Sequence, residues 1–263
     1  MIDLHSHILP GIDDGAKDLD MSLAMARIAV EDGTTHIACT PHFMSGVYDN
    51  TVPVTTNIIT ELEAAFRDNS INLALIPGGD IHIAPDIADR LANGTLPTLG
   101  VSNYFLFEPP HHVLPPGIVQ LCKGIMAAKY MPVLTHPERL TWIEKHYDVI
   151  CQLDELGVVV QLTAASITGK FGTRALYWSE RMLDEGRVDI IASDAHNIRS
   201  RPPGLSRARD IIAARFDDQV AMMMVKDNPQ QILQNRPVAK KQRTKTEASK
   251  PVKKGFWAAI GFE

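Results

Sequence analysis

The chain opens on Met1-Ile2-Asp3-Leu4-His5-Ser6-His7, in which a short apolar strand, Ile2–His5, leads directly into two histidines. Six further runs share its character, being short and rich in β-branched and other apolar residues: His36–Thr40, Leu73–Pro77, Tyr104–Glu108, Pro132–His136, Val158–Leu162 and Val188–Ser193. Longer amphipathic stretches separate these runs. Strands that alternate with helices in this way predict an α/β protein with repeated βα units around a parallel sheet.

The spacing of apolar residues predicts the helices. The stretch 19–31 has one apolar face, made of Leu19, Leu23, Ala26 and Val30. Asp18 and Asp20 lie at its start, where the helix dipole favours negative charge, and Gly33 follows as a stop signal. Similar spacing predicts helices over Val119–Lys129, Trp142–Leu156, Leu176–Glu185, Ile211–Val225 and Asn228–Leu233.

The composition is that of an ordinary globular protein. Of the 263 residues, 45% are hydrophobic and 22% are charged. The apolar runs fall far short of the ~18 residues that a membrane-spanning helix needs, and the first residues lack the basic and apolar regions of a secretory signal. Cys39, Cys122 and Cys151 are widely spaced without a CxxC pair, which argues against a disulfide framework or a thiolate zinc site. These features predict a cytoplasmic protein.

Charge divides the chain into two parts. Residues 236–263 carry a net charge of +6, so the remaining 235 residues carry a net charge of −11. So acidic a body is a poor partner for a nucleic-acid backbone. The polar, basic stretch 240–254 predicts disorder, and an apolar segment with Phe256 and Trp257 follows it. We predict a folded domain over 1–235 and a disordered basic tail over 236–263, which could contact an anionic membrane or a protein partner.

Residues able to bind metal follow nearly every predicted strand. They are His5, His7, Asp14, His42, Asp80, Glu108, His136, Asp194 and His196. In a barrel or open sheet of parallel strands, the C-terminal strand ends lie on one face, where such folds build their active sites. Imidazole and carboxylate donors without thiolates suit Mn, Fe, Zn or Co. Nine ligands exceed what one ion can use, and carboxylates can bridge neighbouring ions, so the set predicts two or three ions.

Several motifs together give the chain a specific resemblance. They are residues 1–7, Asp13-Asp14-Gly15, Thr40-Pro41-His42, Gly78-Gly79-Asp80-Ile81, residues 135–139, residues 162–172 and residues 192–197. From Met1 to about Leu233 the chain resembles the polymerase-and-histidinol-phosphatase superfamily, and within it the bacterial capsule and exopolysaccharide protein-tyrosine phosphatases. The resemblance implies a distorted (β/α)7 barrel and a trinuclear manganese-type centre held by the nine residues above. It also implies phosphotyrosine on a tyrosine autokinase of polysaccharide synthesis as the substrate.

One position departs from the family pattern. Asp80 stands where the family usually has glutamate, whose side chain is longer by one methylene. If this carboxylate bridges two ions, the shorter side chain must move the backbone or widen the ion pair.

Arg139 and Arg201 are the predicted phosphate contacts. A guanidinium group can bind two phosphoryl oxygens and stabilise the charge that grows in the transition state, and the resemblance assigns both residues this role. Arg199 is a weaker third candidate. The centre predicts direct hydrolysis without a covalent enzyme intermediate, and His196 or a metal ion could help the phenolate leave.

A cysteine mechanism is excluded by spacing. Cysteine-dependent tyrosine phosphatases need an arginine six residues after the nucleophile. The three cysteines of this chain are followed at that spacing by Ser45, Ala128 and Gly157.

Other functions use similar residues. A histidinol-phosphate phosphatase or a nuclease-like proofreading domain of the same superfamily would need much the same ligands, although the acidic body argues against the nuclease. A phosphopeptide-binding protein without turnover is the alternative from a different class. Five histidines are left out of the predicted site, because they lie at a strand start, on a helix or in loops at the mouth: His36, His146, His82, His111 and His112.

Overall fold

The computed structural model describes residues 1–239. Its strands are β1 (Ile2–Asp3), β2 (His36–Cys39), β3 (His42–Phe43), β4 (Ala74–Pro77), β5 (Asp80–His82), β6 (Tyr104–Glu108), β7 (Met131–Leu134), β8 (Val159–Thr163) and β9 (Ile190–Ala192). Its helices are α1 (Leu19–Glu31), α2 (Val52–Asp68), α3 (Ile87–Ala92), α4 (Ile118–Ala127), α5 (Ile143–Leu156), α6 (Ala164–Ile167), α7 (Gly172–Asp184), α8 (Ser206–Arg215), α9 (Asp218–Met222) and α10 (Asn228–Leu233). A 3₁₀ turn, η1 (Pro137–Arg139), precedes α5, and a π-helical turn, η2 (Met223–Asp227), joins α9 to α10.

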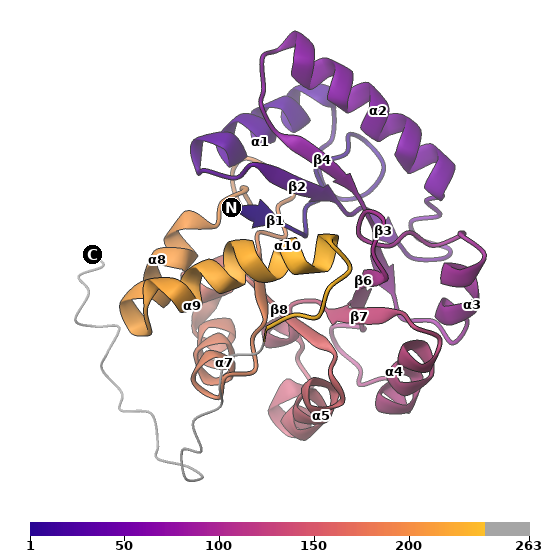
Figure 1. Cartoon of the computed structure of the whole chain (residues 1–263), viewed down its shortest axis with the longest axis vertical. Coiled ribbons are helices and arrows are strands. Elements are labelled where there is room, and N and C mark those ends of the chain that lie inside the picture. The colour runs from indigo at the N-terminus through magenta and orange to yellow at the C-terminus, as the bar shows by residue number, and fades with distance from the viewer. Residues whose placement is uncertain (240–263) are drawn as a thin grey trace.

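The strands form a distorted parallel barrel, as the resemblance implied (Figure 1). One sheet has the order β1-β2-β4 and the other the order β3-β5-β6-β7-β8-β9, and every strand pair is parallel. A parallel bridge between Ser6 and Ala195 joins the segment after β1 to the segment after β9. The backbone of Asp194 donates to the His5 carbonyl at 2.9 Å there. This bridge brings the first and last predicted strands together.

Two short strands, β3 and β5, were not predicted. Each continues a predicted strand after a break, β3 beyond β2 and β5 beyond β4. The first break contains Pro41, which has no amide hydrogen for the ladder, and the second contains Gly78 and Gly79. The two breaks separate the two sheets. They distort the barrel at the positions where His42 and Asp80 begin the new strands.

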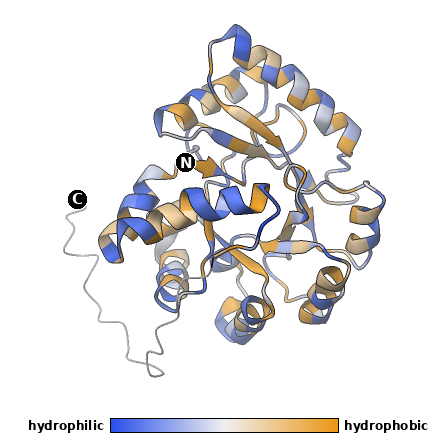
Figure 2. Ribbon diagram, viewed as in Figure 1, coloured by the Kyte–Doolittle hydropathy of each residue, from blue (hydrophilic) through white to orange (hydrophobic). Residues whose placement is uncertain are grey.

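The core follows from burial of the strands on both faces. All five residues of β6 and of β8 are buried, with Phe105 and Phe107 fully inaccessible. Continuous burial is expected of parallel strands inside a ring of helices. Figure 2 shows hydrophobic and hydrophilic residues interleaved along those helices, as their single buried faces require.

The C-terminal helices cover one end of the barrel. Ile232 of α10 packs in the same apolar cluster as Ile2 of β1 and Ala38 of β2. Because Ile2 lies at the start of the first strand, α10 lies over the N-terminal strand ends. The opposite end, where the strands finish, carries the candidate ligands.

Most of the predicted helix ranges match observed helices, although α2 was not among them. The observed α1 has the predicted bounds, and the Asp18 side chain accepts the Met21 N–H at 2.9 Å as its N-cap. The single helix predicted over Ile211–Val225 is wrong. The chain breaks at Phe216, and Asp217 caps a new helix by accepting the Val220 N–H at 2.7 Å. The cap at Asp217 begins α9 separately from α8, although the apolar pattern continues through this position.

The described chain remains attached to the barrel through Ala239. Asn228 donates to the Ala239 carbonyl at 2.9 Å and accepts its N–H at 3.1 Å, and Tyr104 donates to the Arg236 carbonyl at 2.9 Å. The predicted tail over 236–263 falls, from residue 240 onward, outside the described residues. Within residues 1–239 no helix combines the length and apolarity needed to cross a membrane.

Candidate metal centre

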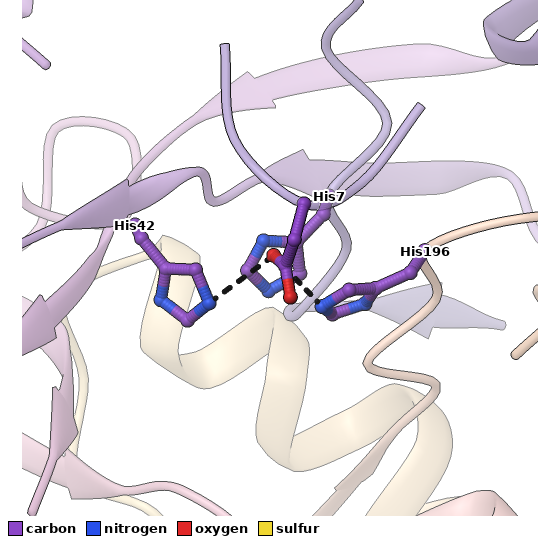
Figure 3. Close-up of side chains that lie close together, drawn as sticks. His7, His42 and His196 are labelled. Carbon is purple, nitrogen blue, oxygen red and sulfur yellow. Dashed lines mark ion pairs between the residues drawn. The ribbon is translucent and has the colours of Figure 1, made fainter. Parts of the chain in front are cut away.

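The structure brings all nine predicted ligands together at the C-terminal ends of the strands. The donor atoms of these nine residues and of His111 fall into five overlapping groups, and the atoms of each group lie within 4.8 Å of one another. The groups are His7, Asp14, His42 and His196; His5, His7 and Asp80; His5, His136 and Asp194; Glu108, His111 and His136; and His42, Asp80 and Glu108. Shared members link the groups into one continuous centre. Figure 3 shows His42 and His196 on either side of His7, and its dashed lines mark the ion pairs that His42 and His196 each make with Asp14.

The alternation of His5-Ser6-His7 places both imidazoles on one side of the chain, as predicted. Their Nε2 atoms are 3.3 Å apart, and both rings are fully buried. Residues two apart in an extended chain point the same way, so this pair can grip a single ion.

Neighbouring groups fix the orientation of three of these imidazoles. The Nδ1 atom of His7 is 2.7 Å from Asp13 Oδ2, that of His5 is 2.9 Å from Gln161 Oε1, and that of His196 is 3.0 Å from the Asp194 carbonyl. Since these oxygens can only accept, each Nδ1 carries a proton, and Nε2 is the ring nitrogen that faces the centre and can bind an ion when the imidazole is neutral.

Asp13 and Gln161 are positioning residues that the sequence interpretation did not identify. Asp13 lies beside the predicted ligand Asp14, and it also accepts the His42 and Gly15 N–H groups at 3.1 and 2.9 Å. The sequence feature that could have indicated Gln161 is an amide side chain in β8, a strand whose residues are mostly apolar and all buried. A buried amide oxygen needs a partner, and His5 Nδ1 provides it.

The backbone closes tightly around His7 at Gly15. A Cβ atom built at Gly15 would lie 2.1 Å from the His7 carbonyl oxygen and 2.4 Å from His7 Cβ. We expect Gly15→Ala to lower the free energy of unfolding by about 1–3 kcal/mol, as overpacking does, and to weaken metal binding by displacing Asp13 and Asp14. Urea unfolding and metal titration measure both effects.

Gly124→Ala is the matched control. Gly124 lies in α4, and a Cβ atom there would meet nothing within 4 Å. Alanine should therefore be neutral or stabilising by up to about 1 kcal/mol. Equal behaviour of the two variants would contradict the close approach at Gly15.

Asp194 connects the centre to the two predicted phosphate contacts. Its Oδ1 atom lies 3.4 Å from His5 Nε2 and 3.5 Å from His7 Nε2, while its Oδ2 atom accepts from Arg139 and Arg201, each at 2.5 Å. Burial raises the pKa of this carboxyl, but His5, His7 and Arg201 together hold it well below its usual value. Asp194 is therefore ionised.

Two of the ligands adopt a left-handed backbone. His136 has φ 35° and Asp194 has φ 51°, a region that side-chain-bearing residues rarely occupy. Such strain persists only where the surrounding structure enforces it, and it gathers at functional sites.

The carboxylates of the centre raise the pKa of the imidazoles that face them. Burial lowers the pKa of His5, but the Asp194 and Asp80 carboxylates raise it to about 9. Burial also lowers the pKa of His42, but the Asp14 and Glu108 carboxylates raise it to about 11. A bound divalent ion would provide positive charge to these carboxylates and would require the imidazoles to be neutral.

The donor set fits divalent cations. Both carboxylate oxygens of Asp80, together with His42 Nδ1 and His136 Nδ1, are buried without a hydrogen-bond partner among the described residues. Buried polar atoms are normally satisfied, so these atoms call for a cation. The oriented Nε2 atom of His196 also faces Asp14 Oδ1 at 3.3 Å, a contact between two acceptors that a cation or proton must separate.

Arg139 and Arg201 stack on one aromatic ring beside the centre. The guanidinium carbons of Arg139 and Arg201 lie 5.0 and 6.0 Å from the centroid of the Phe171 ring, and both side chains are about one-fifth exposed, at 22% and 21%. Phe171 thus holds two cations at the edge of the centre, where an anion could reach them. Arg199 is exposed on the loop after His196.

Two histidines left out of the predicted site lie against one of its carboxylates. His82 Nδ1 is 3.9 Å from Glu108 Oε2, and His111 Nε2 is 3.4 Å from Glu108 Oε1. His82 is two residues beyond Asp80 on the unpredicted strand β5, so it points to the same side. His36 at the start of β2, His146 within α5 and the exposed His112 are not members of any of the five groups.

Asp80 is the most deeply enclosed of the carboxylate ligands. Its side chain is fully buried, with Oδ2 3.3 Å from His5 Nε2 and 3.6 Å from His42 Nδ1. We expect Asp80→Glu to raise metal affinity or activity, because the longer side chain restores the bridging reach typical of the family. Metal titration with a steady-state assay measures this, and a strongly harmful effect would mean that the loop has adapted to aspartate.

Parallel strands curled into a distorted barrel, with clustered histidines and carboxylates at their C-terminal ends, are the architecture of metal-dependent α/β-barrel hydrolases. Residues 1–234 match the model of the capsular polysaccharide synthesis family CpsB/CapC, and the chain belongs to that family.

Known proteins of this family are similar over most of the chain. The tyrosine-protein phosphatase YwqE of Bacillus subtilis is 33% identical over 238 residues, which cover 90% of this chain and 93% of that protein. The tyrosine-protein phosphatase CpsB of Streptococcus pneumoniae is 28% identical over 89% of this chain and 98% of that protein.

Solved structures agree with the barrel. One solved structure comes from a set of crystal structures of B. subtilis YwqE and S. pneumoniae CpsB, which are described there as unique metal-dependent tyrosine phosphatases. It superposes on this chain with a TM-score of 0.89 at 32% sequence identity, and the match covers 94% of this chain and 100% of that chain. A probable 2-pyrone-4,6-dicarboxylic acid hydrolase of Acinetobacter baumannii has a TM-score of 0.54 at 14% identity, over 89% of this chain and 98% of that chain, and shares the fold alone.

Proposed function

We propose that the chain is a metal-dependent phosphatase that hydrolyses phosphotyrosine on protein substrates. The observation that carries the proposal is a continuous centre of nine nitrogen and oxygen ligands with two partly exposed arginines at its edge. Its relatives are named as tyrosine-protein phosphatases. We propose manganese as the metal, with two or three ions in the centre, and a cytoplasmic location.

The arginines are suited to bind the phosphoryl group. Arg139 and Arg201 already converge on one carboxylate oxygen of Asp194, so their donors point to a common place. Two planar forks aimed at one anion can bind a phosphate ester and favour the greater charge of its transition state. Divalent ions at the centre would supply further positive charge and lower the pKa of bound water.

The orientation of His196 favours a role as a ligand over that of a proton donor. Its Nδ1 proton is committed to the Asp194 carbonyl at 3.0 Å, which leaves Nε2 as an acceptor. A tyrosyl leaving group has a pKa of ~10 and needs less help from a general acid than an alkoxide does. The absence of a proton at Nε2 is therefore compatible with an aryl substrate.

The rim of the centre suits an aromatic substrate. Tyr48 stacks on His42, with ring centroids 5.3 Å apart and an angle of 16° between the rings. Three large apolar side chains are exposed in segments that follow strands β3, β6 and β9, namely Val47, Val113 and Ile198. Apolar surface around a cationic centre fits a phosphorylated aryl group on a peptide.

Comparative turnover tests the proposal. Metal-stripped protein is reloaded with Mn²⁺ and given a phosphotyrosine peptide, histidinol phosphate and single-stranded DNA side by side, with metal content measured. We expect the phosphotyrosine peptide to be hydrolysed most efficiently. Faster hydrolysis of histidinol phosphate or DNA would favour the other phosphoesterases, and binding of phosphopeptide without turnover would favour a scaffold.

We further propose that the protein substrate is a tyrosine autokinase of capsule or exopolysaccharide synthesis, and that residues 240–263 assist its recognition or contact the membrane. This segment carries seven Lys or Arg. Polybasic attraction to an anionic lipid surface is worth ~1 kcal/mol per residue and weakens with salt.

Removal of the tail should affect only large partners. We expect truncation after Ala239 to leave hydrolysis of a small aryl phosphate unchanged, because the described ligands end at His196. The same truncation should weaken action on the intact kinase or binding to anionic vesicles at low salt. Identical behaviour of both forms with kinase and vesicles would remove the docking role, and loss of small-substrate turnover would place the tail within the folded domain.

A further inference from the structure

Glu108 faces two directions within the centre. Its Oε2 atom lies 3.4 Å from His42 Nδ1, and His42 forms a donor group with Asp80 on that side. Its Oε1 atom lies 3.5 Å from His136 Nε2. Such a carboxylate can bridge two ions, but on the Oε1 side the nine family-type ligands supply only Glu108 and His136.

His111 occupies the remaining place on that side. Its Nε2 atom is 3.4 Å from Glu108 Oε1, its ring centroid is 5.0 Å from that of His136, and the three donors lie within 4.8 Å of one another. Two donors held about 2.1 Å from one ion at a tetrahedral angle are about 3.4 Å apart. The distances from Glu108 Oε1 to the two imidazoles therefore match those of donors that share an ion.

The loop that carries His111 is held in place from behind. Thr141 donates to the His111 carbonyl through both its N–H at 2.8 Å and its hydroxyl at 3.0 Å. The buried Trp142 donates through Nε1 to the Pro110 carbonyl at 2.9 Å. These bonds anchor the loop that carries His111 to the segment just before α5, so the backbone that presents His111 to Glu108 is held in place.

We infer that His111 is a metal ligand that completes, with Glu108 and His136, a site for a divalent transition ion. Two imidazoles and one carboxylate suit Zn, Fe, Mn or Co rather than Mg or Ca, which prefer oxygen donors. His111 is 29% exposed, so this ion lies at the mouth of the centre. The inference rests on the metal centre of the proposed function but not on its phosphatase reaction.

The neighbouring His112 provides a matched control. It is exposed and belongs to none of the donor groups, although its ring centroid is only 6.3 Å from that of His111. His111→Ala and His112→Ala each remove one imidazole from adjacent positions of the same loop. Alanine at 111 also keeps the carbonyl that Thr141 binds, so the loop should remain in place.

The experiment is titration of the metal-free full chain with Mn²⁺ and Co²⁺, with ion stoichiometry and the visible Co²⁺ spectrum as readouts. We expect His111→Ala to weaken one site by at least the ~10–100-fold that loss of an outer-sphere partner costs, and to change the Co²⁺ spectrum, while His112→Ala matches the wild type.

Equal titrations for His111→Ala and His112→Ala would overturn the inference. Full recovery of the wild-type affinity and Co²⁺ spectrum in His111→Gln, whose amide can still donate to Glu108, would also overturn it, because hydrogen bonding would then suffice. If His111→Ala alters metal binding while the wild-type chain fails to hydrolyse phosphotyrosine, the result would support His111 ligation and reject the proposed function alone.

Discussion

His136→Ala is expected to abolish phosphatase activity together with metal binding, whereas Arg139→Ala should keep the metal and slow turnover. His136 is 2% exposed, and its imidazole belongs to two of the donor groups, one with His5 and Asp194 and one with Glu108. Without His136 a bound ion would lose one of its ligands. The buried carboxylates would then lack the positive charge of that ion. Metal analysis and steady-state kinetics on the same preparations measure both properties.

The expected effect of Arg139→Ala is different in kind. Its guanidinium group contacts the outer oxygen of Asp194, while the other oxygen faces His5 and His7. Removal of one preorganised donor to developing charge costs ~10²–10³ in rate at comparable sites. Arg139→Lys should fall between the wild type and the alanine variant, because it keeps the charge without the planar fork.

Arg67→Ala is the control for the loss of one positive charge. Arg67 is exposed in the last turn of α2, so its variant should behave as the wild type. Equal metal loss in His136→Ala and Arg139→Ala would show that Arg139 supports the centre instead of binding phosphate.

The positions of the ligands could be predicted because strand order and chemistry coincide. Each ligand-bearing segment follows a strand whose apolar residues are evident in the sequence, and parallel strands bring their ends to one face. The alternation at His5 and His7 predicted their shared orientation correctly. The same logic located α1, where an N-cap aspartate and an apolar stripe agree.

What escaped prediction depends on tertiary contacts. The short strands β3 and β5 exist because neighbouring strands pair with them beyond the breaks at Pro41 and Gly79. His111 reaches Glu108 because Thr141 and Trp142, about thirty residues later, hold its loop. Phe171 contacts Arg139 and Arg201 from a third segment. No local pattern around these residues records such partners.

Chelation is expected to remove activity completely, and Mn²⁺ or a similar divalent ion should restore it. Both Asp80 carboxylate oxygens are buried without a hydrogen-bond partner within residues 1–239, and the Nδ1 contacts of His5, His7 and His196 leave their Nε2 atoms available to bind an ion. Refilling should release protons, because these imidazoles bind metal only when neutral. Activity and metal content are measured before stripping, after stripping and after titration back.

Thiol alkylation, by contrast, should have little effect on turnover. Cys39 and Cys122 are fully buried in apolar clusters, and burial raises the pKa of the Cys122 thiol to about 12 and that of Cys39 still further above its usual value. Burial also raises the pKa of Cys151. A nucleophilic cysteine needs the opposite, a lowered pKa and access to substrate. A variant with Cys39→Ala, Cys122→Ala and Cys151→Ser should therefore retain activity, alanine being used where a buried hydroxyl would be left unpaired. Full activity in metal-free protein would show that the reaction does not depend on the metal centre, and loss of activity in a normally folded triple variant would show that it depends on a cysteine.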